Sequence, residues 1–221
     1  MALAADYNLG PNTFPRGWFV IAESSELDVS PLAIHFFGED LALYRGQSGK
    51  PVLLDAYCAH MGTHLTAGKS SMIVKNGKQI EGDSIRCPYH GWRYSPTGEV
   101  DDIPYFDGPC PKSASIRSYP VVDNMGCIMA WYDADNREPD FDPPHLEEWD
   151  DPQWVKWNLD HLGEVEIHPQ EILDNMADVR HLGPTHGAPC EYFSNEFKDH
   201  LYIQRQGGPM QLYDTYLRTT T

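Results

Sequence analysis

Short apolar runs, separated by clusters of glycine, proline, aspartate and serine, dominate the first 133 residues of the chain. Runs of this length and composition favour β-strands, and the clusters between them favour turns. Asn76-Gly77 predicts a tight turn, because both residues tolerate the positive φ angles of a two-residue hairpin. The pattern therefore predicts an all-β region, with strands at 17–22, 32–37, 41–45, 51–57 and 126–133 and a hairpin at 73–80.

The clearest helical pattern lies at 169–182, in the sequence PQEILDNMADVRHL. Pro169 suits the first position of a helix, and Glu171 suits its positive N-terminal end. Apolar residues then recur at helical spacing along the segment. The second half of the chain is therefore predicted to mix one helix with strands, at 154–167, 200–204 and 210–218.

A strongly acidic stretch separates the two patterns. Residues 133–151 contain nine acidic residues, one arginine and three prolines. Such a composition favours a solvated connector over a packed element. We therefore predict one domain over residues 1–142, a connector at 143–152 and a second domain over 153–221.

The net charge of −17 over 221 residues excludes the basic face that a nucleic-acid partner requires. No run approaches the ~18 apolar residues that cross a bilayer, and Asp6 interrupts the apolar stretch that a signal peptide needs. We therefore expect a cytoplasmic protein without a membrane span. The five cysteines are an odd and sparse set, which favours metal ligation over a secreted disulfide framework.

Cysteine and histidine occur together twice, as Cys58 with His60 and as Cys87 with His90. The simplest interpretation is a structural zinc site with two cysteine and two histidine ligands. Zinc fingers usually group like residues, however, whereas each pair here is mixed. In a Rieske [2Fe–2S] centre two cysteines hold one iron and two histidines hold the other, so each of two facing loops delivers one ligand of each type. The mixed order favours the iron–sulfur cluster over zinc.

The sequences CAHMGTHL and CPYHGW, which contain these residues, resemble the Rieske signatures Cys-x-His-x-Gly-x-x-Leu and Cys-Pro-x-His-Gly. The resemblance implies a Rieske domain over 1–142, with Cys58, His60, Cys87 and His90 as the cluster ligands.

Departures from the high-potential Rieske proteins point to a low-potential centre. Those proteins have a disulfide at the positions of Thr63 and Tyr89 and a serine at the position of Trp92. The 26 residues between the two motifs also exceed the usual spacing. We assign the excess to a surface hairpin at 69–83, since insertions in surface loops cost little.

A second candidate site lies in LDNMADVRHLGPTH, which contains Asn175, Asp178, His181 and His186. On a continuous helix two residues five apart lie about 140° apart and cannot share one ion. Gly183-Pro184 falls between the histidines, and proline ends a helix at the residue before it. We therefore predict a break there that turns His186 back toward His181.

This stretch resembles the mononuclear iron motif of Rieske non-haem iron oxygenases. The resemblance implies that His181 and His186 bind Fe(II), that Asp178 bridges His181 to a cluster histidine of a neighbouring subunit, and that Asn175 lines the iron site. A two-histidine, one-carboxylate site needs a third ligand. In the family that ligand lies on a helix far downstream, and neither Asp199 nor Asp214 suits the role.

The motifs together resemble the oxygenase component of 3-ketosteroid 9α-hydroxylase and the cholesterol 7-desaturases. The resemblance implies an all-β Rieske domain followed by the N-terminal part of an α+β helix-grip catalytic domain, assembled as a homotrimer. It also implies O₂, a small hydrophobic or steroid-like substrate, and electrons from an NAD(P)H-dependent reductase or a ferredoxin. Two alternatives remain open at this point: a Rieske ferredoxin-like carrier with a vestigial catalytic part, and an oxygenase that hydroxylates or demethylates aromatic compounds.

Overall fold

The computed structural model describes residues 4–8, 15–28, 30–156, 163, 165–210 and 215–220. By its internal contacts the chain divides into an N-terminal unit, residues 12–161, and a C-terminal unit, residues 162–221 with 1–11. Every helix in the described ranges is too short or too polar to cross a membrane.

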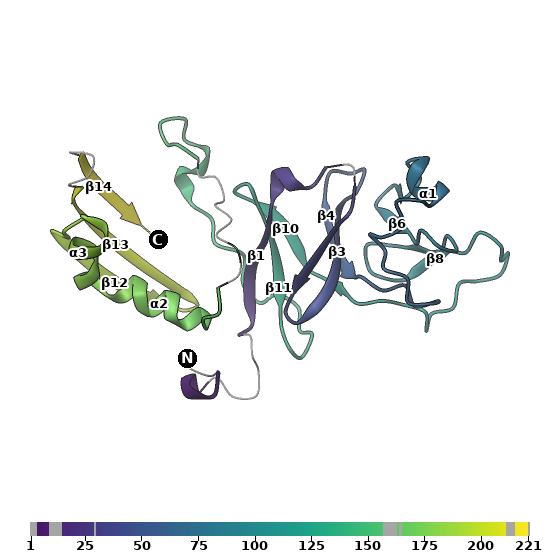
Figure 1. The fold of residues 1–221 in the computed structure, drawn as a ribbon, viewed down its shortest axis with the longest axis horizontal. Helices are drawn as coiled ribbons and strands as arrows, with labels where there is room; N and C mark the ends of the chain where they lie inside the picture. The colour runs from purple at the N-terminus through teal and green to yellow at the C-terminus, as the bar shows by residue number, and fades with distance from the viewer. Residues whose placement is uncertain are drawn as a thin grey trace. The chain divides into compact units, whose positions relative to one another are not determined.

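Three antiparallel sheets build the N-terminal unit (Figure 1). Their strand orders are β1-β11-β10, β2-β3-β4-β9 and β5-β6-β7-β8. The strands are β1 (Gly17–Glu23), β2 (Leu32–Phe36), β3 (Glu39–Arg45), β4 (Pro51–Asp55), β5 (Ile80–Glu81), β6 (Ser84–Arg86), β7 (Arg93–Tyr94), β8 (Val100–Asp102), β9 (Ser118–Tyr119), β10 (Val121–Asn124) and β11 (Cys127–Tyr132). Single turns of 3-10 helix form η2 (Ser24–Glu26) and η3 (Glu147–Asp150). The strands predicted at 17–22, 32–37, 41–45, 51–57 and 126–133 are confirmed.

The middle of the central strand β3, residues 41–44, is buried throughout and does not alternate between apolar and polar residues. Leu41 and Leu43 face one buried cluster of side chains, whereas Ala42 and Tyr44 face another. A strand that is covered on both faces has no solvent side on which to place polar residues. The second of these clusters also contains Cys58, so the core of the fold reaches directly to the predicted metal ligands.

The segment predicted as a hairpin at 73–80 begins instead with the short helix α1 (Met72–Lys75). The Oγ atom of Ser71 caps the helix by accepting a hydrogen bond from the N–H of Ile73 at 3.2 Å. The helix closes at Asn76, and Gly77 follows with a φ of 65°. Asn-Gly suits a helix end in the left-handed conformation as well as a tight hairpin. The hairpin prediction is therefore wrong, although the chain does reverse there.

The acidic stretch at 133–151 contains little regular structure, as its composition predicts, but its first half packs against β11. The side chain of Asp133 is buried, and its carboxylate accepts hydrogen bonds from a backbone N–H and from Arg137. The ring of Phe141 lies 4.8 Å from that of Trp131, measured between centroids.

The C-terminal unit combines a three-stranded antiparallel sheet, in the order β12-β13-β14, with short helices (Figure 1). Its elements are η1 (Ala4–Tyr7), α2 (Pro169–Ala177), η4 (Val179–His181), α3 (Leu182–His186), β12 (Tyr192–Lys198), β13 (Leu201–Met210) and β14 (Thr215–Thr220). The strand predicted at 200–204 lies in β13, and the one predicted at 210–218 overlaps β13 and β14, with 211–214 outside the described residues. The prediction at 154–167 is wrong for the residues described there, which form no strand. The predicted order, an all-β region followed by part of an α+β region, is confirmed.

The predicted helix begins at Pro169 as expected, but it breaks earlier than its sequence suggests. At Asp178 the backbone leaves the helical region, with φ −82° and ψ 91°, and the side chain accepts a hydrogen bond from the N–H of Arg180 at 2.9 Å. Gly183 and Pro184 lie in the first turn of α3, where a missing N–H costs no intrahelical bond. The break predicted at Gly183-Pro184 is therefore wrong, and the break at Asp178 replaces it.

Candidate metal centres

Two loops with the same backbone hydrogen bonds carry the predicted cluster ligands, and we name them the first ligand loop (58–65) and the second ligand loop (87–92). In each, the cysteine N–H donates to the carbonyl five residues on, and the glycine four residues on donates to the cysteine carbonyl. The bonds are Cys58 N to Thr63 O (2.9 Å), Gly62 N to Cys58 O (2.8 Å), Cys87 N to Trp92 O (2.7 Å) and Gly91 N to Cys87 O (3.1 Å). Both glycines have positive φ angles, 67° and 79°, which glycine adopts without strain. Equivalent loops present equivalent ligands.

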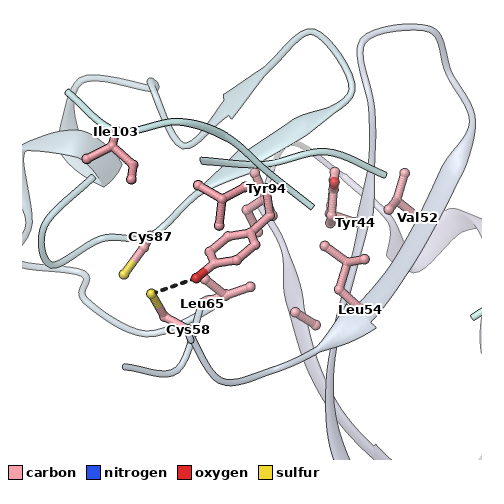
Figure 2. Close-up of a cluster of buried hydrophobic side chains, with 11 residues drawn as sticks. Tyr44, Val52, Leu54, Cys58, Leu65, Cys87, Tyr94 and Ile103 are labelled. Atoms are coloured by element: carbon pink, nitrogen blue, oxygen red, sulfur yellow. Dashed lines mark hydrogen bonds between the residues drawn. The ribbon is translucent and has the colours of Figure 1, made fainter. Parts of the chain in front are cut away.

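The fold sorts the four side chains by type. The thiols of Cys58 and Cys87 lie within hydrogen-bonding reach, and their sulfur atoms point toward one another in Figure 2. The rings of His60 and His90 have centroids 4.7 Å apart. A cluster with two unlike irons needs this sorting, because each iron takes only two protein ligands.

A zinc site would instead bring all four groups to one point. Among the described residues there is no group of three or more histidine, cysteine, aspartate or glutamate side chains arranged around a single ion. His60 also has a buried Nδ1 atom without a hydrogen-bond partner in the described part of the chain. A buried acceptor without a partner is costly unless it binds something, and a metal ion is a suitable partner for imidazole nitrogen. The residues therefore fit a [2Fe–2S] cluster.

The two cysteines are buried, whereas the two histidines are partly exposed. A hydrogen bond from the Cys87 thiol, together with donors that include the N–H groups of His60 and Met61, lowers the pKa of Cys58 to about 5. The thiolate is the form that binds a metal, so these donors prepare the site for it. The arrangement places the thiolates inside and the imidazoles at the surface.

Two aromatic residues, Trp92 at the end of the second ligand loop and Tyr94 just after it, contact the predicted ligands. The Tyr94 hydroxyl lies 3.0 Å from the sulfur of Cys58 and accepts a hydrogen bond from the N–H of Ala59 at 2.9 Å. Burial raises the pKa of Tyr94, so the phenol keeps its proton and donates to the sulfur. The Trp92 ring stacks on His60, with centroids 4.6 Å apart and planes 3° from parallel. The sequence gives no sign of the Tyr94 contact, because 36 residues separate it from Cys58.

The segment between the two ligand loops contributes three side-chain donors, each of which binds a backbone carbonyl of a ligand loop. The bonds are Ser71 Oγ to Pro88 O (2.7 Å), Gln79 Nε2 to Leu65 O (2.6 Å) and Arg86 Nη1 to Gly91 O (2.6 Å). Carboxylates of Glu81 and Asp102 pair with the same Arg86 side chain at 2.6 and 2.7 Å. The segment that we assigned to a surface hairpin therefore forms hydrogen bonds with both ligand loops.

The second predicted site also forms in part. The rings of His181 and His186 have centroids 5.2 Å apart, at 75° to each other. Two imidazoles at this separation can share one ion through metal–nitrogen bonds of about 2.1 Å. The Nδ1 atom of His181 donates to the backbone carbonyl of Asp178 at 2.5 Å, and the Asp178 carboxylate lies 3.7 Å from the same nitrogen. The helix breaks at Asp178 instead of at Gly183-Pro184, and the earlier break still brings the two histidine rings together as predicted.

The remaining predicted residues do not complete this site within the described chain. Asn175 lies exposed in the last turn of α2. Asp199 occupies the tight turn between β12 and β13 with a φ of 53°, and Asp214 lies outside the described residues. A hollow of about 250 Å³ adjoins His186 and is lined by Leu182, Ala188, Cys190, Gln206, Gly207 and Gly208. The C-terminal unit thus offers two convergent imidazoles beside a largely apolar hollow.

Comparison with protein families assigns two successive parts of the chain to known domains. Residues 17–120 match the family described as "Rieske [2Fe-2S] domain", and residues 130–220 match "3-Ketosteroid 9alpha-hydroxylase C-terminal domain".

Curated relatives include cholesterol 7-desaturase of Bombyx mori, which is 38% identical over 182 residues, 80% of this chain and 37% of that protein. The oxygenase component of 3-ketosteroid-9-alpha-monooxygenase from Rhodococcus rhodochrous is 32% identical over 202 residues, 89% of this chain and 50% of that protein. The chain thus spans half or less of the length of these relatives. Among solved structures, dicamba monooxygenase is 25% identical with a TM-score of 0.63, over 89% of this chain and 55% of that chain.

Proposed function

The chain belongs to the Rieske oxygenases, and we propose that it is part of the terminal oxygenase component of a Rieske-type monooxygenase that hydroxylates a steroid-like substrate. The observation that carries the proposal is the sorted pairing of two buried thiols and two partly exposed imidazoles, followed in the same chain by a second pair of convergent histidines. When bound, the cluster supplies single electrons and the mononuclear iron supplies the site at which O₂ is reduced.

We assign the cluster to Cys58, His60, Cys87 and His90. The two buried cysteines would hold one iron, and the donors around Cys58 stabilise the negative charge of its thiolate. The two histidines would hold the other iron, and their partial exposure would give a redox partner access to it. We propose an NAD(P)H-dependent reductase or a ferredoxin as that partner, and the cytoplasm, where NAD(P)H is supplied, as the location.

We assign the mononuclear iron to His181 and His186, with a third ligand from elsewhere in the protein. The backbone carbonyl of Asp178 fixes the orientation of the His181 ring by accepting its Nδ1–H. The carboxylate of Asp178 accepts the N–H of Arg180 through one oxygen, and the side chain is 54% exposed. It is therefore available to a cluster histidine of a neighbouring subunit, which supports Asp178 as the bridging residue in a homotrimer. Asn175, one turn of α2 earlier, remains a candidate for the lining of this site.

We infer the substrate class from the curated relatives and from the hollow beside His186. The lining includes Leu182 and Ala188 together with two glycines, which suits an apolar ring better than a charged molecule. Both curated relatives act on sterols or steroids according to their names.

Iron and acid-labile sulfide analysis of the purified chain tests the proposal. We expect a red-brown protein with two sulfides and three irons per chain, of which one iron is lost in the His181→Ala variant. A colourless protein that contains zinc would refute the cluster assignment.

A Rieske electron carrier is the second candidate function, and one observation favours it. The described residues supply only two of the three protein ligands that a mononuclear site of this type requires. Two irons per chain, with a full visible spectrum and no change in His181→Ala, would support a carrier instead of an oxygenase.

A further inference from the structure

The helix α1 packs closely against the second ligand loop, although it belongs to the extra length between the motifs. A Cβ atom on Gly68, just before the helix, would lie 2.8 Å from the Cβ of Pro88. A Cβ atom on Gly91 would lie 3.7 Å from the Cδ1 of Ile73. The helix and the residues just before it therefore lie against the second ligand loop.

Ser71 makes the polar contact at this junction. Its Oγ atom donates to the carbonyl of Pro88 at 2.7 Å while it accepts the N–H of Ile73. The carbonyl of Pro88 belongs to the same peptide group as the N–H of Tyr89, and that N–H lies close enough to the sulfur of Cys87 to favour the ionised form of the thiol. One planar peptide group therefore has the Ser71 hydroxyl at one end and the thiolate at the other.

We propose that Ser71 is a positioning residue that raises the reduction potential of the cluster through this peptide group. A donor on the carbonyl polarises the peptide, so its N–H becomes a stronger donor to sulfur. The reduced cluster carries one more negative charge than the oxidised cluster, so the reduced state gains more from that donor. The hydroxyl also fixes the plane of the peptide, which keeps the N–H directed at the sulfur. The inference rests on the cluster assigned under the proposed function.

The test compares four variants of the cluster-loaded chain by dye-linked redox titration and by the rate at which a chelator bleaches the visible absorbance. Ser71→Gly removes the hydroxyl but keeps a residue that is tolerated at a helix N-cap. Ser71→Thr restores the hydroxyl. Ser70→Gly makes the same change at the neighbouring exposed serine. Lys75→Gly weakens α1 itself at an exposed position.

We expect Ser71→Gly alone to shift the midpoint potential to a more negative value. We also expect it to bleach about fivefold faster, the factor that corresponds to one ordinary hydrogen bond. Ser71→Thr should match the wild type in both measurements. An unchanged potential in Ser71→Gly, or an equal shift in Lys75→Gly, would overturn the inference while leaving the cluster assignment intact. A wild-type chain without the cluster would instead overturn the proposed function on which the inference rests.

Discussion

The hydrogen bond from Tyr94 to Cys58 allows the most direct test of how the protein sets the potential of the proposed cluster. The Tyr94→Phe substitution removes one oxygen atom from a fully buried side chain. The sulfur of Cys58 loses a donor at 3.0 Å, and the N–H of Ala59 loses its acceptor at 2.9 Å. The ring itself keeps its place among the apolar residues of the core (Figure 2).

The expected shift in midpoint potential depends on how much negative charge the sulfur carries in each redox state. A hydrogen bond to a charged group contributes about 1.5–3 kcal/mol, against about 0.5–1.5 kcal/mol for a neutral pair. We take the difference, about 1 kcal/mol, as the extra stabilisation of the reduced state. At about 59 mV for each tenfold change in a one-electron couple, Tyr94→Phe should lower the midpoint potential by about 40 mV. The unpaired N–H of Ala59 should also lower the free energy of unfolding by about 1–3 kcal/mol.

Tyr44→Phe is the matched control, because Tyr44 lies in the same buried cluster and donates to a backbone carbonyl, that of Asp83, at 2.8 Å. It should lower the stability of the fold and leave the potential unchanged. Redox titration measures the potential, and urea unfolding followed by circular dichroism measures the stability. If Tyr94→Phe keeps the wild-type potential with the cluster intact, or if Tyr44→Phe shifts it equally, the hydrogen bond does not set the potential.

Three other substitutions test the side-chain contacts that support the second ligand loop and the second metal site. Arg86→Leu removes the donor to the second ligand loop and the partner of Asp102, while Glu81 keeps its ion pair with Arg93, so urea unfolding should show a loss of about 2 kcal/mol. The hydrogen bond from Arg86 lowers the pKa of Glu81 below its usual 4.5, so the ionised form stabilises the fold above that pH and the stabilisation is lost on acidification. Glu81→Gln should therefore flatten the fall of the urea midpoint between about pH 5 and pH 3, and an unchanged slope would refute this. Asp178→Asn should keep the iron content and lower reductase-driven turnover about 10–100-fold, and normal turnover would exclude Asp178 as the bridge.

The strands and the ligand loops were predictable because their signals are local. In the middle of β3 and β4, at residues 41–44 and 52–54, every side chain is buried and suits a strand that is covered on both faces, so the apolar runs marked these strands correctly. Each ligand loop closes through hydrogen bonds between residues four and five positions apart, so a short motif contains most of what determines its shape. The sorting of cysteine with cysteine and histidine with histidine follows from placing two such loops face to face.

The errors arose where one dipeptide suits two structures. Asn76-Gly77 is compatible with a hairpin and with a helix end, and the cap supplied by Ser71 decides between them. Gly183-Pro184 resembles a helix breaker, yet proline is accepted in a first turn, so the side chain of Asp178 determines the break instead. In both cases a capping side chain a few residues earlier in the chain outweighs the turn-forming residues.

The donors that set the chemistry were beyond prediction, because they reach the ligands through tertiary contacts. Tyr94 and Ser71 lie on different elements, yet both act on the buried thiolate side of the site. The imidazole side carries instead the exposed side chains of Met61 and Tyr89, each next to a histidine ligand. We therefore propose that separate residues control the potential of the cluster and the access of a redox partner to it. Variants at Tyr94 and Ser71 should therefore change the potential without changing the surface that a redox partner meets, so any change in the rate of electron transfer can be attributed to driving force alone.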